Sequence, residues 1–144
     1  MALSFDTLWA VLAAVVGTFV LGFLWYGPLL GKPWTRAMGW DRLSEVERMG
    51  RQKDAMPGYA TSIGGTVVAT LVLWILYGWA VQGATYSGPM LGMAIGLAGW
   101  LAFYLPGTLT SRFFEGKGWT LTWIGAGYWA ACALIQGAAV GFFA

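Results

Sequence analysis

The distribution of charged residues constrains this chain more than any other feature. No Asp, Glu, Lys or Arg occurs in 7–31, 55–111 or 118–144. About 20 consecutive apolar residues cross a bilayer as a helix, so the outer stretches each fit one helix and the middle stretch fits two helices and a turn. A soluble helix needs a polar face toward water, and these stretches have none. The sequence therefore predicts an all-α integral membrane protein with four transmembrane helices in a compact bundle.

Composition agrees with this prediction. The chain is 58% hydrophobic and only 10% charged, whereas soluble domains carry about 25% charge. We expect a single membrane domain over 1–144. Its helices should span about 5–30, 59–81, 89–110 and 119–143, with a cytoplasmic loop at 31–57.

The basic residues predict the orientation of the bundle. Of the eight Lys and Arg, Arg112 and Lys117 lie between the third and fourth helices and the rest lie in 31–57, while the turn between the second and third helices has none. Basic residues of short loops stay in the cytoplasm. We therefore expect a bacterial cytoplasmic (inner) membrane protein with both termini on the non-cytoplasmic side.

The long connection has local structure of its own. Ser44 followed by Glu47 is a capping-box pattern, which predicts a short helix from Glu45 to about Lys53. A second short turn can begin at Pro33. These segments either lie in the headgroup layer, as interfacial helices do, or form an ordinary solvated loop.

The exit of the first helix carries an unusual group of residues. Trp25 and Tyr26 are amphipathic rings suited to the headgroup level, and Pro28 loosens the last turn, which another helix must then support. Lys32 and Trp34 anchor the exit on the cytoplasmic side. This stretch is more elaborate than a membrane anchor alone requires.

A faint internal repeat links the two halves of the chain. The segment 104–106 (YLP) echoes 26–28 (YGP), and 116–119 (GKGW) echoes 31–34 (GKPW). The echo indicates two tandem helical hairpins in parallel orientation, as in some transport folds. The alternative is coincidence in a chain rich in glycine and aromatic residues.

Small residues predict how the helices associate. Lipid tails are as apolar as leucine, so close contact between small side chains drives helix pairing in membranes. Gly92 and Gly96 form one GxxxG pair, and Gly137 and Gly141 form another. We favour packing of these faces inside one chain; the alternative is contact with a second protomer or another protein.

The spans carry little chemistry. They contain no ionisable Asp, Glu, Lys or Arg, and the chain has no His, although proton relays and coupled carriers normally need such groups in the membrane. Met90 and Met93 are interpreted as packing residues rather than a soft-metal site. We expect no cofactor, no metal, no catalytic constellation and no nucleic-acid partner.

One polar cluster stands out after the third helix. Arg112 and Glu115 are three residues apart and should share a helix face, with Lys117 close behind. The cluster is either a surface ion pair of little energetic value or a polar lock at the cytoplasmic mouth that meets Lys32 or Arg36. A membrane enzyme acting on lipid would have to use Glu115 as its acid or base.

Three motifs in order give the chain a family resemblance. They are WYGPLLGKPW at 25–34, FFEGKGW at 113–119 and IGAGYW at 124–129. Together they resemble the small bacterial membrane-protein family catalogued as domain of unknown function 1761. The resemblance implies four helices and no known activity. The candidate motif residues are Trp25, Tyr26, Pro28, Lys32, Trp34, Arg112, Glu115, Gly116, Tyr128 and Trp129.

The functional expectation follows from these points. We expect a multi-pass membrane protein without a catalytic role, in contact with the lipid bilayer. It should act as an accessory or structural component that packs with itself, as a homo-oligomer, or with a larger membrane complex. The alternative is a passive channel or carrier for a small neutral solute.

Overall fold

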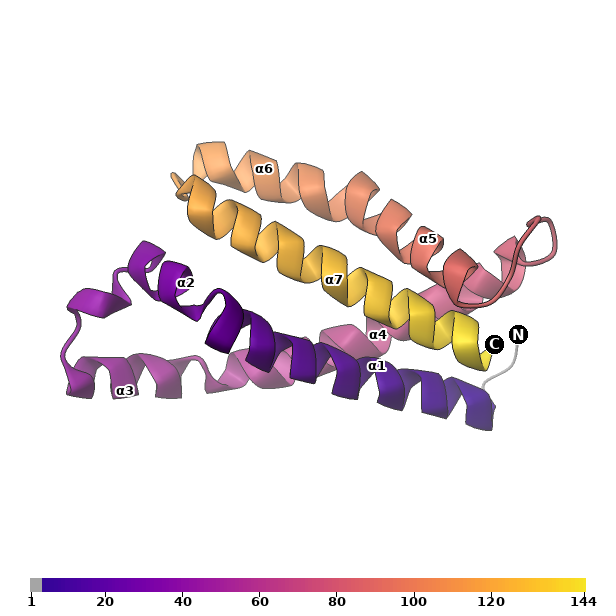
Figure 1. Ribbon diagram of the computed structural model, residues 1–144, viewed down its shortest axis with the longest axis horizontal. Coiled ribbons are helices and arrows are strands. Elements are labelled where there is room, and N and C mark those ends of the chain that lie inside the picture. The colour runs from indigo at the N-terminus through magenta and orange to yellow at the C-terminus, as the bar shows by residue number, and fades with distance from the viewer. Residues whose placement is uncertain (1–3) are drawn as a thin grey trace.

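The computed structural model describes residues 4–144 and consists of helices joined by short turns (Figure 1). Helices account for 86% of the described residues, which contain no strand. Four of the helical spans are long and apolar enough to cross a membrane: Phe5–Leu29, Glu45–Ala80, Pro89–Phe114 and Trp119–Phe143. The predicted all-α architecture with four potential membrane spans is confirmed.

The first span consists of a regular helix and a wider final turn. Helix α1 (Phe5–Leu24) begins at Ser4, whose side chain forms a capping box with Thr7. It continues as a π-helical turn, η1 (Trp25–Leu29), which contains Pro28. Because proline has no N–H to donate, the regular bonding pattern is interrupted there, and the Leu30 N–H bonds instead to the Trp25 carbonyl at 2.8 Å.

The connection between the first span and the uncharged part of the second, which begins after Asp54, is helical along most of its length. It holds α2 (Gly31–Ala37), the short turn η2 (Trp40–Arg42) and α3 (Glu45–Asp54). The predicted capping box at the start of α3 is present, since the Glu47 N–H donates to the Ser44 hydroxyl and the Ser44 N–H donates to the Glu47 carboxylate. Helix α4 (Met56–Ala80) follows almost at once.

The second half contains the remaining two spans. The third is built from α5 (Pro89–Gly99), a second π-helical turn η3 (Trp100–Tyr104) and α6 (Leu105–Phe114). It ends at Phe114 rather than at about 110, because Arg112 does not interrupt the helix and the Glu115 N–H still bonds to the Ser111 carbonyl. Helix α7 (Trp119–Phe143) completes the chain's four spans.

Helix α7 occupies the centre of the bundle. It packs against α1, α4 and α5, and most extensively against α5 (Figure 1). Helices α2 and α3 and the α6–α7 turn lie at one end of the molecule, and the C-terminus and the α4–α5 turn lie at the other (Figure 1). All eight basic residues therefore lie at one end.

The closest helix contact is made without side chains. A Cβ atom at Gly92 would overlap the Gly137 carbonyl, one at Gly96 would overlap the Ala133 carbonyl, and one at Gly141 would overlap the Gly88 carbonyl. The two GxxxG faces thus pack against each other within one chain, as favoured from the sequence. Backbones approach this closely only where no Cβ intervenes.

Candidate functional site

Two tryptophans attach the π-helical turns to α7. The Trp25 indole N–H in η1 donates to the Ile124 carbonyl at 3.0 Å, and the Trp100 indole N–H in η3 donates to the Ala126 carbonyl at 3.1 Å. The first and third spans are thereby bonded to carbonyls two residues apart on the same central helix. π-Helical turns occur frequently at functional sites. The region around η1 and η3 is therefore the candidate functional site of this molecule.

Half of the predicted motif residues meet here in an aromatic cluster, which we define as Trp25, Tyr26, Trp34, Trp40, Tyr104, Tyr128 and Trp129. The ring of Tyr26 lies 5.1 Å from that of Tyr128 and 5.6 Å from that of Trp34. The remaining contacts have centroid separations of 5.0 to 6.4 Å. These separations suit offset or edge-to-face pairing.

Two members of the aromatic cluster were absent from the predicted set. Tyr104 packs on Trp129 at 5.6 Å, and the echo between 104–106 and 26–28 was the signal that pointed to it. Trp40 packs on Trp34 at 5.0 Å, and nothing in its local sequence indicates this contact, because it depends on the turn between α2 and α3.

An open cleft of about 570 Å³ lies beside the aromatic cluster, at the basic end of the molecule. Its walls come from α2, from the third span and from the start of α7. The lining residues are Trp34, Met38, Phe103, Tyr104, Gly107, Thr108, Ser111, Lys117, Leu121, Thr122 and Gly125. Aromatic rings, hydroxyl groups and one cation thus share a single surface.

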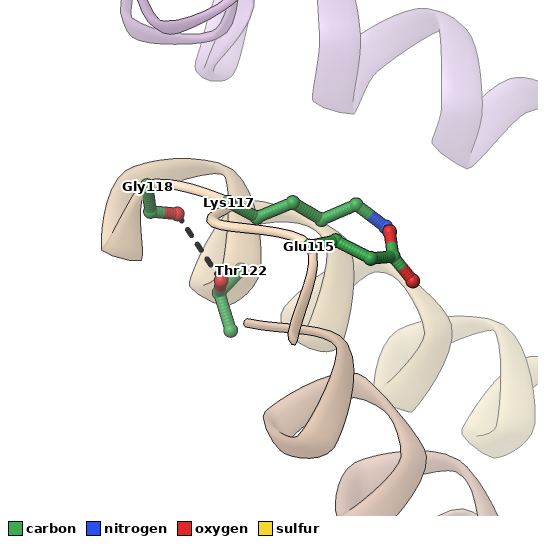
Figure 2. A network of polar contacts seen from close by, with 4 residues as sticks. All are labelled: Glu115, Lys117, Gly118 and Thr122. Carbon is green, nitrogen blue, oxygen red and sulfur yellow. Dashed lines mark hydrogen bonds and ion pairs between the residues drawn. The ribbon is translucent and has the colours of Figure 1, made fainter. Parts of the chain in front are cut away.

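The mouth of the cleft carries an ion pair different from the predicted one. The Lys117 ammonium contacts the Glu115 carboxylate at 2.6 Å, beside Thr122, whose hydroxyl donates to the Gly118 carbonyl (Figure 2). The predicted pairing of Glu115 with Arg112 is wrong. Since α6 ends at Phe114 and Gly116 adopts a left-handed φ of 66°, the chain reverses and brings Lys117 to Glu115.

Arg112 instead lies over an aromatic ring. Its guanidinium carbon is 4.9 Å from the ring centroid of Trp119, within the range of a cation–π contact. The Lys117 ammonium, and to a smaller extent the Ser111 hydroxyl, lower the pKa of Glu115 by hydrogen bonding. In the described residues no ion pair joins Lys32 or Arg36 to Glu115, so the polar lock with the first exit is not formed.

Eight of the ten predicted motif residues fall into two groups. Trp25, Tyr26, Trp34, Tyr128 and Trp129 belong to the aromatic cluster, and Pro28 lies in η1 together with the first two of them. Arg112, Glu115 and Gly116 belong to the α6–α7 turn, while Lys32 is exposed on α2. The cleft is lined by Trp34 of the first group and by Lys117, which follows the second group in the α6–α7 turn. Residues 4–144 contain no cluster of His, Cys, Asp or Glu that could hold a metal ion.

These features define a small helical protein with four potential membrane spans and an aromatic-walled cleft at its basic end. The chain belongs to the family described as "Protein of unknown function (DUF1761)", whose sequence model matches residues 9–141. The match agrees with the resemblance carried by the three motifs. Neither a curated protein nor a solved structure gave a match.

Proposed function

We propose that this protein is an accessory or structural component of the bacterial cytoplasmic membrane, without a catalytic role, that packs with itself or with a larger membrane complex. Both termini face the non-cytoplasmic side in this proposal. The observation that supports it most directly is the amino-terminal half of α4. Every residue in 56–65 is exposed, although the segment is uncharged and rich in small side chains.

Small side chains at this position favour a protein neighbour. Gly58, Ser62 and Gly65 recur at the three- or four-residue spacing of one helix face. Beyond the neighbouring backbone of α4 itself, no atom of residues 4–144 lies within 4 Å of a Cβ added at Gly58 or Gly65. Apolar surface gains nothing from leaving lipid, so helices associate where small residues permit close approach. The GxxxG faces of α5 and α7 are already used inside the chain, whereas this face of α4 remains open.

Cross-linking tests the proposal directly. In a Cys132→Ala background, Ser62→Cys should give a covalent dimer in native membranes when the face pairs with a second copy. Gly65→Leu should reduce that product. Gly99→Leu is the matched control, because Gly99 also has open space around it but lies on the third span, and it should leave the product unchanged.

Gentle extraction followed by mass spectrometry distinguishes the two kinds of partner. A homo-oligomer gives the cross-linked product alone, whereas a larger complex gives a co-purifying protein that Gly65→Leu releases. A strictly monomeric particle in mild detergent, with no partner and no cross-link, would overturn the proposal.

A passive channel or carrier for a small neutral solute is the second candidate. The π-helical turn η3 in the third span favours it, because it interrupts the helix where Phe103 and Tyr104 line the open cleft. Purified protein in proteoliposomes should then conduct the solute faster than empty vesicles. Flux equal to that of empty vesicles would remove this candidate.

A further inference from the structure

The cleft between α2, α6 and α7 has a lining that changes along its length. Met38, Phe103 and Leu121 supply apolar surface, while Thr108, Ser111 and Thr122 supply hydroxyl groups and Lys117 supplies a cation. Tyr104, Thr108 and Ser111 follow one another at the spacing of a single helix face. A ligand that fits such a lining has an apolar body and a polar, anionic head.

Two glycines leave room for that body. Gly107 on α6 and Gly125 on α7 both line the cleft. Apart from the nearby backbone of its own helix, a Cβ added to either would find no atom of the described residues within 4 Å. The space beside them is not needed for helix packing. It differs in this respect from the α5–α7 contact, where the missing side chains allow two backbones to touch.

The charge at the mouth is available to an anion. Lys117 and Glu115 are each about half exposed, with side-chain exposures of 51% and 54%, and an exposed ion pair contributes little to stability. A phosphate can therefore replace the Glu115 carboxylate as the partner of Lys117 at small cost. All eight Lys and Arg lie at this end of the molecule, which makes it the end that attracts anionic lipid surfaces.

We propose that this cleft binds one anionic phospholipid. The phosphate lies against Lys117 and the Ser111 and Thr108 hydroxyls, and an acyl chain extends past Phe103 and Met38 and over Gly107 and Gly125. The position suits a lipid because the cleft lies where a span ends, at the level of the headgroups. This inference does not depend on whether the protein has a protein partner.

Native mass spectrometry of the full chain in mild detergent tests the proposal. The protein is titrated with phosphatidylglycerol or with phosphatidylcholine of the same acyl chains. We expect one phosphatidylglycerol to bind more tightly than phosphatidylcholine. Lys117→Gln should weaken phosphatidylglycerol binding about fivefold, the effect of one cation near an anionic lipid, and Lys117→Arg should restore it. Glu115→Gln should have the opposite effect and strengthen binding.

Blocking variants separate the cleft from charge in general. Gly125→Leu places a side chain in the open space and should weaken binding of both lipids. If that variant folds poorly, Gly107→Leu tests the same space from the opposite wall and should have the same effect. Gly99→Leu, with equal open space outside the cleft, should change neither. Equal binding of the two lipids, unaffected by either blocking variant, would overturn the proposal. So would displacement of the lipid by millimolar inorganic phosphate, which would identify a site for the free anion.

Discussion

Single glycines set the separation of α5 and α7. At Gly92 and Gly96 the backbone of α5 meets carbonyls of α7, with no room for even one methyl group. Gly99, on the same span, has no such neighbour. Glycine is therefore required for close helix contact at Gly92 and Gly96 but not at Gly99. Substitution at these positions should distinguish the two cases.

Gly92→Ala should loosen the central helix pair. The added Cβ would meet the Gly137 carbonyl, a backbone atom that cannot rotate away, so the helices must separate. Overpacking of this kind costs about 1 to 3 kcal/mol of unfolding free energy. Circular dichroism during denaturation in mild detergent measures the loss. Gly99→Ala is the control and should leave stability equal or slightly higher, since alanine is the better helix former; equal losses in both variants would contradict the assignment.

Glu47 should titrate below its ordinary pKa of 4.5. Hydrogen bonds from the Ser44 hydroxyl and backbone N–H, and to a smaller extent the charge of Arg51, favour its ionised form and lower its pKa. A pKa lowered by folding contributes stability that is fully present above the ordinary value and is lost as the pH falls through the lowered one. NMR titration of the Glu47 carboxyl carbon measures the pKa directly. Ser44→Ala should raise it toward 4.5, and an unchanged value would contradict the cap.

Residue-level prediction succeeded where the interaction is local and failed where the chain turns. The Ser44–Glu47 cap lies within four consecutive residues, so its pattern is legible in the sequence. The Arg112–Glu115 pair assumed that the helix carries both side chains on one face. Because α6 ends at Phe114 and Gly116 adopts a left-handed conformation, the ion-pair partner of Glu115 is Lys117. The spacing of the charged residues predicts neither the helix end nor the conformation of Gly116.

At the scale of elements, the two π-helical turns distinguish this bundle from four plain spans. Each begins with a tryptophan that donates to α7, Trp25 to Ile124 and Trp100 to Ala126. The sequence predicted the four spans and a loosened turn at Pro28, because both follow from composition and from proline geometry. It did not predict the tryptophan bonds, since a donor's partner on a distant helix depends on how the helices pack.

Removing the indole donors should weaken the attachment of both turns. Trp25→Phe and Trp100→Phe keep an aromatic ring but lose the N–H, and side-chain hydrogen bonds between membrane helices contribute about 0.6 kcal/mol, with a maximum of about 1.7. We expect losses of this size for each variant and a larger loss for the double variant. Denaturation in mild detergent measures them; Trp79→Phe, at an exposed position, is the control. Wild-type stability in the double variant would show that the bonds do not support the turns.

At the scale of the whole molecule, the separation of charge between the two ends governs orientation. Helix α3 and the α6–α7 turn lie together at one end, away from the α4–α5 turn (Figure 1). A sequence pattern predicts such a separation well because it needs only the number of crossings and the position of each basic residue. The sequence pattern does not predict which helices are neighbours within the bundle, because all four spans are similarly apolar.

Labelling with a membrane-impermeant maleimide tests the orientation. In a Cys132→Ala background, Ser87→Cys in the α4–α5 turn should react in intact cells. Gln52→Cys in α3 should react only after permeabilisation, because we propose that the basic end lies in the cytoplasm, as basic residues of short loops do. Both positions are exposed, so accessibility within the fold does not bias the comparison. The reverse pattern would contradict the predicted topology.

The central place of α7 has a consequence for biogenesis. It is the last of the four spans to be synthesised, yet α1, α4 and α5 all pack against it. Helices α1 and α5 are therefore inserted in the bilayer without their main neighbour, and α4 with only part of its packing, until 119–143 has been synthesised. Packing around α7 is in this way deferred until the fourth span has been synthesised, and a nascent chain stalled before that point would leave the first three spans without the central helix and exposed to membrane proteases.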